Sequence, residues 1–257
     1  MNTAINFAYK ALTIAEMEAR KIRHDSSELW MRAIQPALWL VVFGSTMSAI
    51  RGLTDDNYSY LQFLTAGALA QAVMFVAILY GVRVIWERDV GMLTKLLSTP
   101  APRSAIVIGK TLAAGVRGVF LAIVVFALTL ILGINLRFDI VDVFGVLSVV
   151  VLFAMCFSSL SITLASMLGT QERMLGLGQA ITMPLFFASN AIYPISFMPI
   201  WLQYISKANP LTYVVDAIRS MLLTGDYSQL PVDMLAIGIS TALFMTTASI
   251  TLRKLVR

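Results

Sequence analysis

The chain has 257 residues, of which 58% are hydrophobic and only 13% charged, and its mean hydropathy is +0.81. Soluble globular domains are usually about 45–50% apolar and about 25% charged, so this composition excludes an ordinary soluble fold. The single cysteine, Cys156, lies inside an apolar run, which excludes a disulfide framework within one chain and indicates a small buried side chain. We therefore expect one membrane domain.

The first expected element is an amphipathic helix over residues 3–24, within an N-terminal segment that covers residues 1–32. Apolar positions alternate with charges at roughly helical spacing, and basic residues gather towards the end. This pattern is typical of a helix on the cytoplasmic membrane surface, although it also fits a helix packed on a partner protein. The segment lacks the apolar core of a signal peptide, so we expect it to be retained.

Six charge-poor runs follow, each near the roughly 20 residues that a helix needs to cross a hydrocarbon core about 30 Å thick. They are residues 33–50, 60–82, 105–134, 143–168, 174–195 and 234–252. Because backbone groups in lipid must be satisfied within the segment, each run is interpreted as a helix. The predicted fold class is an all-α polytopic membrane protein with six transmembrane helices, contained in residues 33–257.

Basic residues are distributed unequally between the two sets of connecting segments. Fourteen lie in segments that share a side with both termini, four lie on the opposite side, and Arg117 lies inside a run. Because Lys and Arg concentrate on the cytoplasmic side of membrane proteins, both termini are predicted to be cytoplasmic. The same topology accounts for the pI of about 9.5, so no nucleic-acid partner is expected.

Between the second and third runs, residues 86–98 are predicted to form a short cytoplasmic helix. The apolar residues that recur at i, i+3 and i+4 are Val90, Leu93, Leu96 and Leu97. The helix should end near Ser98, because residues that precede Pro100 and Pro102 are pushed out of the α region. Such a helix would offer an apolar ridge with charged flanks to a partner.

Between the fifth and sixth runs, residues 194–227 are predicted to form an outer re-entrant hairpin. Pro194 should disrupt the fifth helix as it leaves the membrane. A further helix over 210–223 is expected, with Asn209 as its N-cap and Pro210 at its first position. At about 21 Å this helix is too short to span, so it should dip into the outer leaflet or cap the bundle.

The residues needed for catalysis, a metal site or a nucleotide site are missing from the sequence. Gly109-Lys110-Thr111 matches the end of the phosphate-binding motif G-x-x-x-x-G-K-[ST], but Ser104 stands where the first glycine is required. Lys110 is instead expected to reach the cytoplasmic interface. His24 is the only histidine. We therefore expect no catalytic residue, no metal and no cofactor in this chain.

Two motifs resemble those of a known family. The first comprises Glu87-Arg88, Gly91, Leu93, Leu96-Leu97, Thr99-Pro100, Arg103 and Gly109-Lys110, and the second comprises Asn209 to Tyr213 with Asp216 and Arg219. In both motifs and in topology, the chain resembles the type-2 permeases of ATP-binding-cassette exporters, most closely the daunorubicin-resistance-like drug-export branch. Many members have Thr and then an acid around the leucine after the glycine, where this chain has Met92 and Thr94.

The resemblance implies a permease subunit of the prokaryotic inner membrane that works with separate ATP-binding-cassette ATPase subunits and a second permease chain. ATP and Mg would then be bound by the ATPase. The coupling residues, within a segment of about 84–100, would be Glu87, Arg88, Gly91, Leu93, Leu96 and Leu97. The outer gate would comprise Pro194, Asn209, Pro210, Tyr213, Asp216 and Arg219.

Neutral polar residues within the runs mark a candidate substrate path, and they are Gln71, Gln179, Thr182 and Asn190. These side chains are equally consistent with hydrogen bonds between neighbouring helices. Four of the six runs lack carboxylates that could couple proton or sodium flow, so the energy should come from outside the chain. An apolar path of this kind suits a hydrophobic or amphipathic drug, lipid or lipid-like substrate. The alternatives are export of a polysaccharide or glycolipid, a secondary transporter and a non-transporting scaffold.

Overall fold

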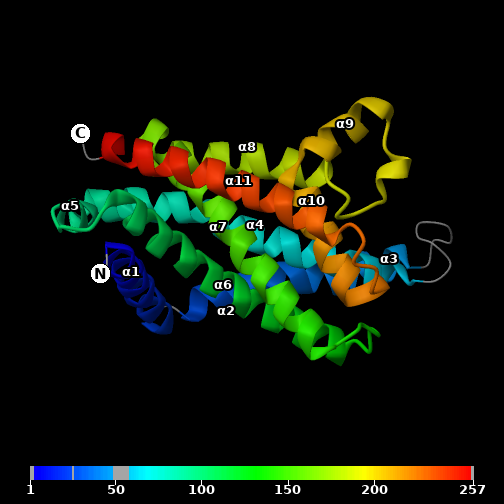
Figure 1. The fold of residues 1–257 in the computed structure, drawn as a ribbon. Coiled ribbons are helices and arrows are strands. Elements are labelled where there is room, and N and C mark those ends of the chain that lie inside the picture. Colours follow the sequence, from blue (N-terminus) through cyan, green and yellow to red (C-terminus); the bar gives the residue numbers. More distant parts are fainter. Residues whose placement is uncertain (1–2, 25, 49–57, 256–257) are drawn as a thin grey trace.

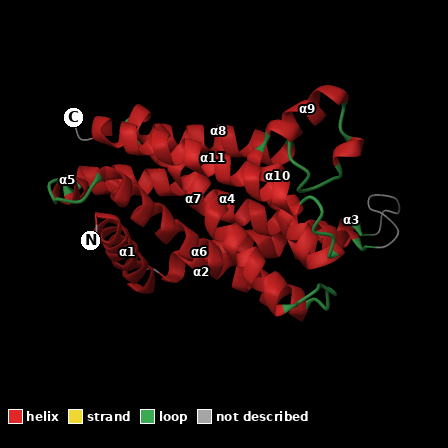
Figure 2. Ribbon diagram, in the orientation of Figure 1, coloured by secondary structure: helices red, strands yellow, loops and turns green. Residues whose placement is uncertain are grey.

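The computed structural model describes the backbone of residues 3–24, 26–48 and 58–255, and the side chains of 7–21, 29–48 and 58–253. The side chain of His24 lies outside this described part. Throughout the described backbone the regular elements are helical and no strand occurs (Figure 2). The predicted all-α class is thereby confirmed.

The helices form an elongated bundle with two distinct ends (Figure 1). Both termini and the short α5 (Met92–Leu97) lie at one end, which we call the termini end. The opposite end, which we call the far end, carries α3 (Ser45–Met47) and α9 (Ile200–Ala208). This placement of the termini is what an even number of crossings requires.

Four of the described helices are long and apolar enough to cross a membrane, and they match the second, third, fourth and sixth predicted runs. They are α4 (Tyr60–Asp89), α6 (Arg103–Ile131), α7 (Ile140–Leu168) and α11 (Leu230–Thr251). α7 packs against the other three. In the most apolar stretch of α4, 78% of the residues are buried, whereas in that of α11 only 17% are. α4 is therefore a core helix and α11 is peripheral.

The first predicted run, 33–50, is a helical stretch that changes geometry along its length. α2 (Ser26–Leu38) continues into the π-helical η1 (Trp39–Gly44) and then α3, while residues 49–57 lie outside the described part. Pro36, within the last turn of α2, has no N–H to donate, and its ring crowds the carbonyl one turn earlier. We assign the change from α to π geometry to this proline.

The fifth predicted run ends earlier than expected, because α8 (Gln171–Phe187) stops before Pro194 is reached. Polar side chains satisfy its last three carbonyls: Asn209 Nδ2 donates to Leu185 O (2.6 Å), Ser189 Oγ to Phe186 O (2.7 Å) and Tyr193 OH to Phe187 O (2.7 Å). Such bonds replace the partners that a continuing helix would supply. The predicted end near residue 195 is therefore wrong, and the side-chain caps are the physical reason.

The outer helix predicted over residues 210–223 is present, and its last turn is π-helical. The segment contains η2 (Ile195–Phe197), α9 (Ile200–Ala208), α10 (Pro210–Arg219) and η3 (Ser220–Thr224). Asn209 Oδ1 accepts the Leu211 N–H (3.0 Å), and Pro210 occupies the first position, as predicted. Gly225 ends the stretch with a φ of 68°, a left-handed conformation that suits glycine.

Two segments flank the spans at the termini end. α1 (Thr3–His24) has the predicted bounds and packs against α6. Near the C-terminus, η4 (Leu252–Leu255) follows α11 directly and packs against α7.

Close packing of α4 against the loop after α8 depends on Gly67. A Cβ at this position would overlap the backbone of Ala191. Nearby, Tyr60 OH donates a hydrogen bond to Ile192 O (2.9 Å). Small residues commonly permit such backbone approach between membrane segments.

Gly67→Ala is expected to lower the free energy of unfolding by about 1–3 kcal/mol, because backbone rather than a flexible side chain would have to move. Gly176→Ala is the matched control, since Gly176 is also helical but has open space around its Cα. That change should be neutral or slightly stabilising. Thermal unfolding of both variants in the same detergent checks this, and equal Tm values would contradict the packing argument.

Candidate functional site

A cluster of buried ionisable side chains joins three helices at the termini end. Lys110 of α6 contacts Glu18 of α1 (Nζ to Oε1, 2.9 Å) and also Glu87 of α4. Lys21 of α1 bonds the same two carboxylates, at 3.1 Å to Glu18 and 3.0 Å to Glu87. Two lysines and two glutamates from α1, α4 and α6 therefore form one connected network.

Burial makes this network a strong constraint on the packing of α1. The side chains of Lys110, Glu18 and Glu87 are at most 2% exposed, whereas that of Lys21 is 31% exposed. A buried charge is tolerated only when it is paired and hydrogen-bonded. If α1 moved away, Lys110 would lose Glu18 and Glu87 would lose Lys21.

The ionisation of Glu18 reflects these partners. Burial by itself would raise the pKa of Glu18, but the charge and hydrogen bond of Lys110, helped by Lys21, outweigh it and lower the pKa to about 2. Glu18 therefore stays ionised across the physiological pH range. Its stabilising contribution is complete above its unfolded-state pKa and is lost as pH falls towards 2.

Aromatic and cationic groups extend the cluster towards the middle of the bundle. Tyr80 OH donates to Glu18 Oε2 (3.3 Å), and the Arg117 guanidinium lies 5.3 Å from the centre of the Tyr80 ring. Arg117 Nη1 also bonds Ala113 O (3.4 Å), while its Nη2 has no hydrogen-bond partner. Arg117, which lies inside the third predicted run, thus adjoins the network through a cation–π contact.

Gly109 explains how α1 reaches Lys110. A Cβ on Gly109 would come within 2.7 Å of Ala11 O and of the Ile14 side chain, so glycine allows α1 to lie directly on α6. The buried stripe of α1 comprises Ala11, Ile14, Ala15 and Glu18. Away from this stripe, Tyr9 and Leu12 are exposed.

The predicted helix over 86–98 is two elements rather than one. Residues 86–89 complete α4, and Gly91 then reverses the chain with a φ of 75° before α5 begins. A left-handed residue cannot continue a helix, so the single-helix prediction is wrong. The predicted end near Ser98 is confirmed, because Ser98 is the C-cap of α5.

The structure divides the predicted coupling residues into inward and outward groups. Leu93 is fully buried and Glu87 belongs to the ion network, so neither side chain is accessible to a partner. Arg88 Nη2 donates to Gly169 O (2.9 Å) at the C-cap of α7 and also bonds Asp89. Leu96 and Leu97 are only partly buried.

An apolar groove of about 290 Å³ opens between α1 and the end of α5. Tyr9 and Met17 of α1 line it together with Leu96 and Pro100. Lys10 Nζ donates to Pro100 O (2.8 Å) and holds the two walls together. Of the predicted coupling leucines, Leu96 is the one that lines this groove.

The predicted outer-gate residues lie at the far end, where a polar cluster joins α10 to the loop after α8. Asn190 Nδ2 donates to Asp216 Oδ1 (2.5 Å), and Arg219 Nη2 donates to Asn190 O (3.0 Å). The Arg219 guanidinium also lies 3.8 Å from the centre of the Phe63 ring. These contacts tie α10 and the loop to α4.

Two other predicted outer-gate residues, Tyr213 and Pro194, form hydrogen bonds within the same segment. Tyr213 OH donates to Lys207 O (2.6 Å) and so links α10 to α9. Pro194 begins η2 and accepts the Phe197 N–H (3.1 Å). Whether these residues move as a gate stays a prediction.

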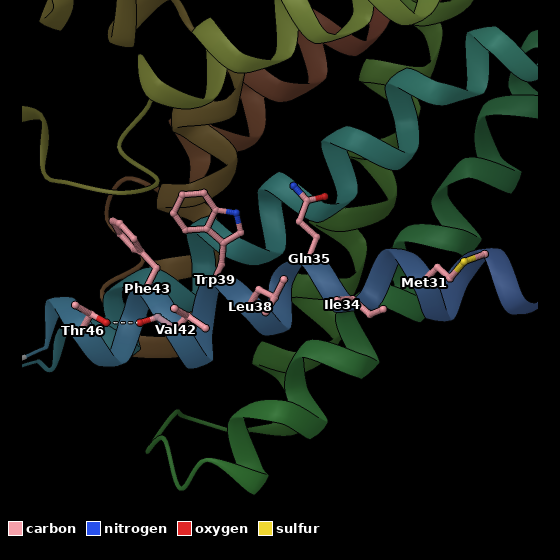
Figure 3. A pocket seen from close by; sticks show the side chains of 8 residues that line it. All are labelled: Met31, Ile34, Gln35, Leu38, Trp39, Val42, Phe43 and Thr46. Atoms are coloured by element: carbon pink, nitrogen blue, oxygen red, sulfur yellow. Dashed lines mark hydrogen bonds between the residues drawn. The ribbon is translucent and has the colours of Figure 1, made fainter.

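The four predicted path residues do not share one surface. Gln71 and Thr182 are buried, Thr182 bonds Gly178 O of its own helix (2.8 Å), and Gln179 is exposed. Asn190 belongs to the far-end cluster. A separate open groove of about 650 Å³ runs along α2, η1 and α3, where Trp39 and Phe43 stand together (Figure 3).

The fold and these sites define an integral membrane protein whose apolar helices are joined at one end by a buried ion network. A family model described as ABC-2 type transporter matches residues 8–223. The chain therefore belongs to the ABC-2 type transporter family, as the two motifs indicated.

Several curated relatives are transport permeases by description. "Putative transport permease ycf38" of Porphyra purpurea is 30% identical over 86% of this chain and 78% of its own length. The protein of the same description from Pyropia yezoensis is 32% identical over 72% of this chain and 64% of its own length. "Daunorubicin resistance ABC transporter permease protein DrrB1" of Streptomyces coeruleorubidus is 26% identical over 78% of this chain and 70% of its length.

Glu18 and Lys110 are the site residues that sequence reasoning missed. Lys110 was expected to reach the cytoplasmic interface, yet its side chain is 1% exposed and bonded to two carboxylates. A usable signal was the position of Glu18, which follows Ala11, Ile14 and Ala15 on one helical stripe. A charge in line with a buried stripe indicates a buried partner.

Lys110→Met is expected to destabilise the chain by about 3–5 kcal/mol, because two buried carboxylates would lose the buried one of the two lysines that pair with them. Lys95→Met is the matched control, since Lys95 is an exposed lysine on α5. Thermal unfolding in detergent measures both effects. A Lys110→Met protein as stable as Lys95→Met would show that the network contributes little.

Proposed function

We propose that this chain is the transmembrane permease subunit of an ATP-binding-cassette exporter. It moves a hydrophobic or amphipathic drug, lipid or lipid-like substrate outward, and ATP hydrolysis takes place in a separate subunit that binds ATP and Mg. The observation that supports this most is the ion network, because it joins the amphipathic α1 to the spanning helices α4 and α6. A force applied to α1 would therefore act directly on the spans.

We propose six crossings, with the α2–η1–α3 stretch as the first and α8 as the fifth. At 1.5 Å per residue, residues 26–47 extend about 33 Å and the 17 residues of α8 about 25 Å. Both lengths are near the thickness of a bilayer core. We propose that the termini end faces the cytoplasm, which the excess of basic residues at that end supports, and that the protein lies in a prokaryotic inner membrane.

The ATPase is proposed to dock on the groove between α1 and α5. This groove is apolar, open and fixed to the ion network through α1. Leu96, Tyr9 and Met17 offer the apolar surface. Glu87 and Leu93 are buried within the chain, so they would support the packing beneath this surface and would not contact the ATPase.

A second permease chain, identical or related, is proposed to complete the transport path. The open groove along α2 and η1 and the sparsely buried α11 are apolar surfaces of the kind that a second bundle or lipid would cover. Two permease chains and two ATPase chains would form the complete exporter.

Export of a polysaccharide or glycolipid is the second candidate. Trp201 and Tyr204 of α9 are 64% and 69% exposed at the far end, and aromatic rings of this kind can stack on sugars. Replacement of both residues by Ala would impair glycan export and leave export of an apolar drug unchanged.

The orientation is tested by single cysteines in a Cys156→Ser background. Thr224→Cys at the far end should react with an impermeant maleimide added to intact cells, whereas Thr94→Cys on α5 should react only after the cells are opened. Both residues are exposed in the chain, so burial does not limit either reaction. Labelling of Thr94→Cys in intact cells would overturn the proposed orientation.

Leu96→Asp tests the docking surface. A leucine buried at the contact contributes roughly 1.5–3 kcal/mol, and the aspartate would add an unpaired charge. We expect normal membrane insertion with loss of ATPase co-purification and of substrate-stimulated hydrolysis. Thr94→Asp, on exposed surface outside the groove, is the control and should retain both. Normal assembly and export by Leu96→Asp would show that the ATPase docks elsewhere.

A further inference from the structure

A polar pocket of about 480 Å³ opens at the far end between α10, η3 and the start of α11. α11 runs from the far end to the termini end, so its first turn, which contains Asp233, lies at the far end (Figure 1). Asp216 and Arg219, two of the predicted outer-gate residues, line the same pocket. Pockets of roughly 300–1,000 Å³ are typical sites for small molecules.

Asp233 lines this pocket with a buried carboxylate that has no partner. The residue is 5% exposed, and its Oδ2 atom is enclosed without a hydrogen bond to any residue that the structure describes. Arg219, the buried cation of the same pocket, is bonded elsewhere, to Asp216 Oδ1 (3.5 Å) and to Asn190 O (3.0 Å). Because a buried charge is unfavourable without a partner, Asp233 would be stabilised by a cation in the pocket.

Negative charge predominates in the pocket. Among the described side chains that line it, Asp216, Asp226 and Asp233 are acidic, and Lys207 and Arg219 are basic. Arg219 and Asp216 form an ion pair, which leaves two carboxylates against the single exposed ammonium of Lys207. A cation that enters the pocket would therefore meet a net negative field.

The lining of the pocket suits an organic ammonium group better than a metal ion. The described residues contain no group of three or more His, Cys, Asp or Glu side chains that could hold a metal. An ammonium group is a donor only, so it needs acceptors, and the hydroxyls of Thr224 and Ser228 line the pocket together with the carboxylates. Ile195 and Val232 add apolar walls that a hydrocarbon group could contact.

We propose that this pocket binds the ammonium group of a small amphipathic amine. Asp233 is the charge partner of the ammonium, and the hydrocarbon part of the amine lies along Ile195 and Val232. Asp216, whose side chain is 41% exposed, offers a second carboxylate. This assignment rests on the proposed function and deepens it, because it names amphipathic amines as the substrate class and the far end as the place where they leave.

The test measures how tightly the purified permease, in phosphatidylcholine nanodiscs, binds the fluorescent amine monodansylcadaverine. Its N-acetyl derivative is the matched neutral probe, since it keeps the dansyl group and the chain. The wild type should bind the amine about tenfold more tightly than the derivative, because a hydrogen bond to a charged group contributes roughly that factor. Asp233→Asn should remove this difference. Asp139→Asn, at an exposed aspartate outside the pocket, should leave it unchanged.

A second variant guards against misfolding of Asp233→Asn. Val232 lines the pocket and is 53% exposed, so Val232→Lys should fold normally while its ammonium repels the amine. It should also lose the difference between the probes.

Equal binding of the two probes by the wild type, or an unchanged difference in both pocket variants, overturns the proposal. Displacement of the amine by phosphatidylethanolamine in the nanodisc would also overturn it, in favour of a site for a lipid headgroup. The assay involves neither the ATPase nor transport, so the site can fail while the proposed export function holds. A permease that binds the amine in this pocket but does not export it would instead contradict the proposed function.

Discussion

The arrangement of the termini end depends on one requirement, that the buried ammonium of Lys110 keeps its carboxylate partners. Glu18 comes from α1 and Glu87 from α4, so the pairing fixes two helices relative to α6. Gly109 allows the approach, and Tyr80 and Lys21 complete the hydrogen bonding of Glu18. Buried ion pairs add little net stability over apolar packing, but they penalise any arrangement that separates them. The network therefore specifies one position of α1.

This constraint supports the mechanical role that we propose for α1. The groove where we propose that the ATPase docks lies partly on α1, and α1 is linked to the spans through the same four charged residues. At the far end, Asn190, Asp216 and Arg219 connect α10 to the loop after α8 in a comparable way. The bundle thus has a polar connection at each end of an apolar middle.

Composition and apolar runs predicted the all-α class and the four most apolar spans. A single segment that crosses lipid must satisfy its own backbone hydrogen bonds, and a helix does so. Helix ends were predicted where local chemistry decides them, as at Asn209 and Ser98. The end of α8 was missed because it depends on side-chain bonds from Ser189, Tyr193 and Asn209, and Asn209 lies 24 positions from its acceptor Leu185. The ion network was missed for the same reason, because Lys110 and Glu18 are 92 positions apart.

A double-mutant cycle between Glu18 and Lys110 tests the central claim most directly. Thermal unfolding of Glu18→Gln, Lys110→Met and the combined variant gives the energy that couples the two side chains. If they form a buried pair, Lys110→Met should be the most destabilised, and the added Glu18→Gln should recover part of the loss by removing a buried charge that has lost its buried partner. Additive effects of the two substitutions would contradict the account, because they would show that the two residues do not interact.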